Sequence, residues 1–133
     1  DEHLKRKVEV LGKRYLQDGN TLLHGDFFPG SWLKTDAGIK FIDPEFCFFG
    51  DVEFEIGVTL AHLKMANQSE ATIDKALNTY KNLNPIDESL CQQFMAVEIL
   101  RRMLGLAQLP LSLDLSKRKD LLEQARTILI TTP

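Results

Sequence analysis

The stretch of residues 24–46, HGDFFPGSWLKTDAGIKFIDPEF, decides how the whole sequence is interpreted. It is largely apolar, yet it carries carboxylates at Asp26, Asp43 and Glu45, each next to glycine, proline or bulky aromatic residues. Such carboxylates are either turn-forming residues of loops or the base and metal-binding groups of an active site. The spacing of the surrounding residues helps to separate the two readings.

Turn chemistry divides this stretch into a predicted β-hairpin. Residues 35–38, Thr-Asp-Ala-Gly, lie between two short apolar segments, residues 31–33 and 39–42, which we expect to pair as antiparallel strands. An antiparallel hairpin returns the chain to its starting point, so Ser31 and Asp43 should lie near each other at its open end. Asp26 precedes the hairpin on a loop, which is a frequent location for catalytic groups.

Helices are predicted on both sides of this hairpin, because apolar residues recur there at helical spacing. Ser69 and Asp87 are suitable N-caps for two of them. The predicted helices span residues 3–17, 53–66, 70–82, 88–108 and 115–130. The expected fold class is therefore mostly α (α+β): one domain of helices with a small β-hairpin that carries the unusual residues.

Composition is that of an ordinary soluble protein. Of the 133 residues, 44% are apolar and 26% are charged, and the net charge of −3 disfavours a nucleic-acid partner. Two cysteines, Cys47 and Cys91, have no metal-site spacing and favour a reducing compartment, the cytoplasm. No apolar run is long enough for a membrane span, so no membrane partner is expected. Nothing in the sequence indicates the oligomeric state.

Oxygen-bearing side chains at this spacing fit phosphoryl transfer. In that reaction a loop carboxylate orients the attacking hydroxyl, and oxygen ligands hold Mg²⁺ against the phosphates of ATP. Asp26 suits the first role, and Ser31 with Asp43 suits the second. Glu45 could add a second carboxylate to the same ion. Pro44 favours an extended conformation at Asp43 and removes a backbone donor, which helps to fix the direction of both carboxylates.

These residues also resemble a known family. His24-Gly25-Asp26, followed by Ser31 and then by Asp43-Pro44-Glu45, is similar to the catalytic loop and metal motif of the aminoglycoside phosphotransferase-like small-molecule kinases. Within that group the form HGD-x4-S with DPEF-x-F-x-G, and the segment EILRRMLGLA at residues 98–107, are most similar to methylthioribose kinases. The resemblance spans nearly the whole chain and implies the C-terminal lobe of a protein-kinase-like fold.

The resemblance implies a role for each matching position. Asp26 would be the catalytic base close to the substrate hydroxyl, and Asp43 would be the principal Mg²⁺ ligand on the ATP side. The other implied roles are a second metal ligand at Glu45, a metal- and cofactor-binding hydroxyl at Ser31, structural support at His24 and Glu55, and substrate contacts at Arg101 and Arg102.

Two positions depart from the family pattern. Ser31 stands where most members have Asn, and a hydroxyl is a different ligand from an amide carbonyl. Glu55, in Phe54-Glu55-Ile56-Gly57, stands where members usually have an Asp that braces the catalytic loop, and its extra methylene puts that brace in question. These departures keep a non-catalytic binding module with a kinase-like fold as an alternative.

Several alternatives stay open at this level. Asp26 could be a loop cap, Asp43-Pro44 could start a turn, and Arg101-Arg102 could be the polar flank of a helix. The acceptor could also be choline, homoserine, fructosamine or an aminoglycoside rather than methylthioribose or a related sugar or alcohol.

The lobe organisation is a further expectation. We expect residues 1–133 to be the catalytic and substrate lobe, with the N-terminal nucleotide lobe absent from this chain, because no Gly-rich loop and strand lysine precede residue 24. The chain alone should then bind ATP weakly and turn over negligibly. Whether it is a fragment or a natural truncation is not decided by the sequence.

Overall fold

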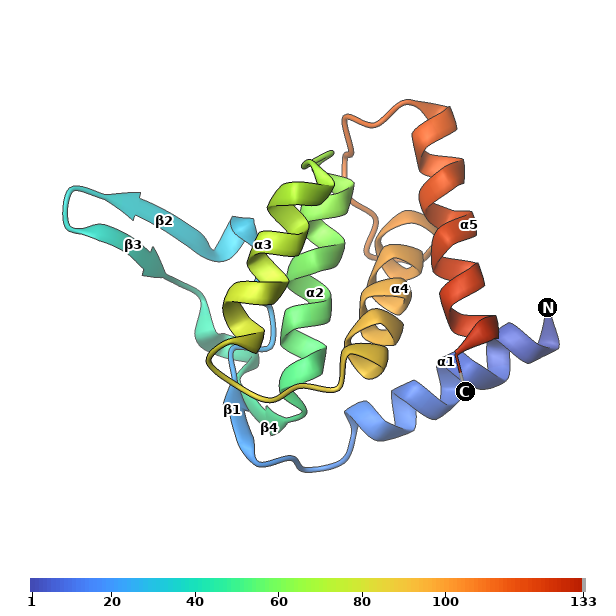
Figure 1. Ribbon diagram of the computed structural model, residues 1–133, viewed down its shortest axis with the longest axis horizontal. Helices are drawn as coiled ribbons and strands as arrows, with labels where there is room; N and C mark the ends of the chain where they lie inside the picture. The colour runs from blue at the N-terminus through green and yellow to red at the C-terminus, as the bar shows by residue number, and fades with distance from the viewer. Residues whose placement is uncertain (133) are drawn as a thin grey trace.

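A computed structural model describes residues 1–132, so the last residue of the expected 1–133 lobe lies outside the described residues. Within this part of the chain, five α-helices pack together and a small β element lies at one side of them (Figure 1). The helices are α1 (Glu2–Tyr15), α2 (Val52–Met65), α3 (Glu70–Lys81), α4 (Glu88–Leu104) and α5 (Leu115–Thr131). The expected mostly α fold with a small hairpin is confirmed.

The strands form two separate antiparallel pairs. The predicted hairpin consists of β2 (Trp32–Thr35) and β3 (Gly38–Phe41), and it projects away from the helices in Figure 1. A second pair, β1 (Thr21–Leu23) with β4 (Phe48–Gly50), was not predicted. This pair joins the segments directly before and after residues 24–47, so the two ends of the stretch that carries the motifs lie side by side.

The core is formed by the helices. α4 lies between α2 and α5, and α1 runs across the ends of α4 and α5 (Figure 1). Gly57 lets α2 pack closely against α4, because a Cβ atom at residue 57 would lie 2.8 Å from the carbonyl oxygen of Cys91 in α4. Leu60, Met95 and Leu129 are among the fully buried side chains at the centre. The helical core therefore holds the start of α2 and the end of α4 in fixed positions beside the loop.

Helix boundaries follow local signals, with one correction. Ser69 and Asp87 cap α3 and α4 as predicted, each accepting a hydrogen bond from a backbone N–H three residues on. The helix predicted for residues 88–108 ends at Leu104, because Gly105 takes up an extended conformation and the chain to residue 114 forms no regular element. That end leaves Arg101 and Arg102 in the last turn of α4.

None of the helices in residues 1–132 is both long enough and apolar enough to cross a membrane.

Candidate active site

The loop that carries Asp26 packs closely against the turn that carries Asp43 and Glu45. It begins at His24 directly after β1, and it ends in a short 3-10 helix, Pro29–Ser31. Gly25 takes a φ of +83°, a left-handed conformation that favours glycine, and a Cβ atom at this position would lie 2.1 Å from the carbonyl oxygen of Phe46. The HGD loop therefore packs directly against the DPEF turn, and only glycine fits between them.

His24 joins the two motifs. Its Nε2 lies 2.8 Å from the carbonyl oxygen of Ile42, the residue before Asp43. Its backbone N–H donates to the Glu55 carboxylate, at 2.7 and 3.1 Å from the two oxygens. His24 thus connects the HGD loop to the residue before Asp43 and to α2.

Glu55 reaches the loop despite its extra methylene. Burial raises the pKa of the Glu55 carboxyl, and hydrogen bonds from the backbone amides of His24 and Gly25 oppose that effect. One turn further along α2, the Thr59 hydroxyl donates to the carbonyl oxygen of Phe27 at 2.9 Å. The first two turns of α2 thus brace the HGD loop, at the position where the sequence left the brace in question.

Ser31 and Asp43 meet at the open end of the hairpin, as their spacing predicted. The backbone N–H of Ile42 donates to the carbonyl oxygen of Ser31 at 3.0 Å, which extends the β2–β3 pairing by one step. The buried Ser31 hydroxyl donates to the backbone carbonyl of Asp26 at 2.8 Å. The structure therefore brings the backbones of Asp26, Ser31 and Asp43 to one place, and Ser31 ties the loop to the hairpin.

The extended conformation expected for Asp43 is wrong, because the chain turns at this residue into a short helix, and Asp43 takes a conformation that is strained for a non-glycine residue. Its φ of 60° and ψ of 54° are left-handed, and it opens a 3-10 helix, Pro44–Phe46. Asp43 and Glu45 are both exposed, and neither carboxylate has a hydrogen-bond or ion-pair partner within residues 1–132. Two free carboxylates suit Mg²⁺, which proteins commonly hold with one or two carboxylates while water and phosphates complete the shell. Over the same residues, no cluster of three or more acidic, His or Cys side chains forms a closed metal cage.

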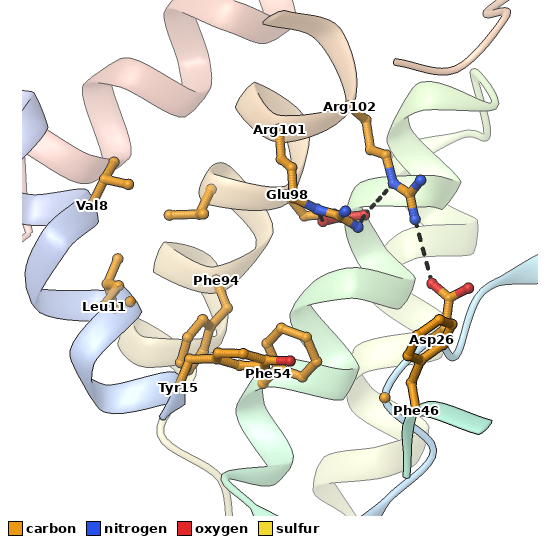
Figure 2. Close-up of a pocket in the computed structure, with 13 residues that line it drawn as sticks. Val8, Leu11, Tyr15, Asp26, Phe46, Phe54, Phe94, Glu98, Arg101 and Arg102 are labelled. Carbon is orange, nitrogen blue, oxygen red and sulfur yellow. Dashed lines mark hydrogen bonds and ion pairs between the residues drawn. The ribbon is translucent and has the colours of Figure 1, made fainter. Parts of the chain in front are cut away.

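Asp26 faces the end of α4. Its carboxylate lies 3.3 Å from Arg102 Nη2 (Figure 2). The Asp26 side chain is 32% exposed. Arg102 is the more enclosed member of the arginine pair, with a side chain 12% exposed against 47% for Arg101. Both arginines line the same cavity as Asp26.

The centre of this charged cluster is Glu98, a residue that the sequence analysis did not single out. Its carboxylate accepts hydrogen bonds from Arg101 Nε at 2.7 Å and from Arg102 Nε at 2.7 Å, and it lies 3.1 Å from His62 Nε2. Burial by itself would raise the pKa of Glu98, but hydrogen bonds from His62 and the two arginines lower it to about 2. A sequence signal existed, because Glu98 precedes the arginines by three and four residues and so shares their helix face.

Phe28 covers the other side of this cluster. Its ring lies 4.5 Å from the His62 ring, centroid to centroid, and the Arg102 guanidinium carbon lies 5.7 Å from its centre. His62 is buried, and it connects α2 to α4 through Glu98. Arg102 is thereby fixed on three sides, by Glu98, Phe28 and Asp26.

A cavity of about 520 Å³ opens beside Asp26. In Figure 2, Asp26 and Arg102 lie at one side of it, and Val8 and Leu11 of α1 lie at the other. Tyr15, Phe54 and Phe94 line it between these sides, with ring centroids 4.9 and 5.6 Å apart in successive pairs. The cavity thus has a charged end, which holds the predicted base, and an apolar end formed mainly by α1.

Comparison with known proteins agrees with this geometry. The family model described as the phosphotransferase enzyme family matches residues 2–88, which is more than half of the chain. The chain therefore belongs to that family, and the resemblance inferred from the HGD and DPE motifs is confirmed.

Similar curated proteins are methylthioribose kinases. The one from Geobacillus sp. (strain WCH70) is 30% identical over 139 aligned positions, which cover 80% of this chain and 35% of that kinase. The one from Exiguobacterium sibiricum is 42% identical over 66 residues, or 50% of this chain and 17% of the kinase. The one from Yersinia pestis (strain Pestoides F) is 43% identical over 63 residues, or 47% and 16%. The chain thus spans at most about a third of the length of these relatives.

Proposed function

We propose that this chain forms the catalytic and acceptor-binding part of a kinase that transfers a phosphoryl group from ATP to a hydroxyl group of a small molecule. One observation carries the proposal. The HGD loop and the DPE turn are joined at the open end of one hairpin, through the hydrogen bonds His24–Ile42 and Ser31–Asp26, and Asp26 opens from there into the cavity. Membership of the phosphotransferase enzyme family supports the same reaction class.

The residues have separate roles in this proposal. Asp26 accepts a hydrogen bond from the acceptor hydroxyl, orients it towards the transferred phosphoryl group and takes its proton. Arg102, at 3.3 Å from Asp26, binds neighbouring acceptor oxygens, and Arg101 lies further out along the same wall. His24 and Glu55 hold the loop, so that Asp26 stays in place during transfer.

Asp43, Glu45 and Ser31 are the proposed ligands of Mg²⁺ and of the nucleotide phosphates. The two free carboxylates at Asp43 and Glu45 fit a hard cation, and the Ser31 hydroxyl keeps acceptor capacity while it donates to Asp26. When bound, Mg²⁺ supplies charge neutralisation to the phosphates. Asp43 has a left-handed backbone directly before Pro44, and Pro44 stabilises the turn that follows.

Methylthioribose, or a related sugar or alcohol, is the proposed acceptor. Three similar curated proteins are named methylthioribose kinases. The cavity offers carboxylate and guanidinium groups for hydroxyls at one end and apolar side chains at the other.

An acceptor screen tests the proposal in the protein that carries this chain together with its nucleotide-binding part. We expect ATP-dependent phosphorylation of methylthioribose in preference to choline, homoserine, fructosamine and aminoglycosides. Asp26→Asn should lower kcat by about 10²- to 10⁴-fold, whereas Asp36→Asn, at the exposed tip of the hairpin, should not. Selective transfer to choline would contradict the acceptor, and full activity in Asp26→Asn would contradict the role of the base.

A non-catalytic binding module is the competing proposal. The hydrogen bonds between Glu55 and the backbone of His24 count against it, because the brace that Glu55 seemed to weaken is present. A Mg²⁺ titration separates the two. Loss of metal-dependent nucleotide binding in Asp43→Ala, with binding kept in Asp36→Ala, supports the kinase. No metal response in the parent protein supports the module.

We also propose that residues 1–133 form the catalytic and substrate lobe, and that the lobe which grips the triphosphate is not among them. The length of the curated relatives is compatible with this division. The chain alone should then bind ATP weakly, and phosphorylation by the isolated chain at a rate typical of kinases would contradict the division.

A further inference from the structure

Gly12 is a glycine that the packing of α1 does not explain. It lies inside the helix, which runs from Glu2 to Tyr15, and it does not take a positive φ. A Cβ atom at this position would meet no neighbouring heavy atom within 4 Å. Glycine weakens a helix interior relative to alanine, so neither backbone geometry nor close packing accounts for its presence.

The position of Gly12 on the cavity supplies a reason. Gly12 lines the cavity together with Val8 and Leu11. Figure 2 shows Val8 and Leu11 on the α1 side of the cavity. Asp26 and Arg102 occupy the opposite side, as Figure 2 also shows. The missing side chain therefore leaves open space at the apolar end of the same cavity whose charged end holds the proposed base.

An acceptor seated against Asp26 places its reacting hydroxyl at the charged end. Any substituent on the far side of such a molecule then points towards α1, where Val8, Leu11 and Gly12 line the cavity and the Tyr15 side chain adds a hydroxyl. An apolar substituent gains burial against the first three, whereas a polar one loses water and meets fewer polar groups there than at the charged end. The cavity thus selects acceptors that have hydroxyls at one end and an apolar group at the other.

We propose that Gly12 is a specificity-determining residue, and that the space above it receives the apolar substituent of a hydroxylated acceptor. The inference rests on the proposed function, in which Asp26 binds the acceptor hydroxyl. It adds that α1 sets the size of the substituent that is accepted, through the absence of a side chain at residue 12. A larger residue there would fill the apolar end and leave the charged end unchanged.

Binding of a graded series of sugars tests this proposal. The probes are ribose and its methylthio, ethylthio and propylthio derivatives. Each is titrated calorimetrically into the full chain of 133 residues. Each buried methylene should increase the affinity of the parent chain about fourfold. In Gly12→Leu that gain should disappear, and the alkylthio sugars should bind at least tenfold more weakly than to the parent, while ribose binding is unchanged. Gly12→Ala should give an intermediate loss.

A matched control separates the cavity from the helix. Lys13→Leu adds the same side chain at the neighbouring, exposed position of α1, which does not line the cavity. It should leave the whole affinity series as in the parent chain. Thermal unfolding of each variant checks that it folds, and since leucine is a better helix former than glycine, Gly12→Leu is expected to fold at least as well.

The outcomes distinguish this inference from the proposed function. Equal losses for ribose and for the alkylthio sugars in Gly12→Leu, or no loss for any of them, would overturn the role of Gly12 while leaving the acceptor site at Asp26 intact. If the parent chain binds none of the sugars, or if Asp26→Asn binds them all as the parent does, the proposed function fails and this inference fails with it.

Discussion

Replacing Glu98 by glutamine tests the charged cluster that positions Arg102. The substitution keeps the shape of the side chain and removes its charge. In the native structure Glu98 is 4% exposed. Its carboxylate accepts hydrogen bonds from Arg101 and Arg102 and lies 3.1 Å from His62 Nε2. Glutamine has one oxygen in place of two, and its amide group donates where the arginines also donate. At least one of those cations therefore loses its partner inside the protein.

The magnitude follows from the pKa of Glu98. A carboxyl whose pKa is lowered from 4.5 to about 2 on folding contributes about 3 kcal/mol to stability at neutral pH. Because the folded-state pKa lies below the unfolded value, this contribution is complete above pH 4.5 and is lost as the pH falls from 4.5 towards 2. Glu98→Gln should therefore be about 3 kcal/mol less stable than the parent at pH 7, and the difference should shrink in acid.

Urea unfolding followed by circular dichroism measures this difference at several pH values between 7 and 2. Other carboxyls, including Glu55 with its raised pKa, titrate in both proteins and cancel in the comparison. Glu123→Gln is the matched control. It removes an exposed carboxylate that lies 3.5 Å from Arg126 on α5, and such surface pairs contribute at most about 0.5 kcal/mol. A stability difference between Glu98→Gln and the parent that stays constant from pH 7 to pH 2 would refute the reasoning.

Three further predictions concern stability and reactivity. Gly12→Ala should raise the free energy of unfolding by about 0.5–1 kcal/mol, measured in urea, because alanine favours the helix and its Cβ meets no neighbour; a destabilised variant would contradict this. Gly25→Ala should destabilise the chain by at least about 1 kcal/mol in the same assay, since its φ is +83° and its Cβ would clash with Phe46. In thiol titration of the native chain, Cys47 should react and Cys91 should not, because Cys91 is buried and burial raises its pKa to about 12; equal reactivity of both thiols would contradict the packing of α4.

Local elements of the fold were predictable because their causes lie within a few residues. The turn at residues 35–38 gave the β2–β3 hairpin, in which Thr35 pairs with Gly38 and its hydroxyl donates to the Gly38 carbonyl. The capping of α3 and α4 by Ser69 and Asp87 has the same local character, since each cap is a hydrogen bond to a backbone N–H three residues on.

The pairing of β1 with β4 could not be predicted in this way. Each strand has only three residues, which is too short to show a clear alternation of apolar and polar residues. About twenty-five residues separate the two strands, so no tight turn between them predicts the pairing. Burial of Leu23 and the fit of Gly25 against Phe46 bring them together only when the whole loop is in place. The end of α4 was missed for a related reason, because the apolar spacing continues past Gly105 although the backbone does not.

The sequence by itself determined the motifs of the proposed site: Asp26 on a loop, Asp43 and Glu45 after a returning strand, and a hairpin that sets Ser31 and Asp43 side by side. These follow from turn chemistry and strand geometry, which act over short distances along the chain. Only the tertiary structure decided that Glu98 is buried against His62 of α2 and that Gly12 lines the cavity shared with Asp26. Burial and charge pairing depend on which helices cover a residue, and that is set by the packing of α1, α2 and α4 together.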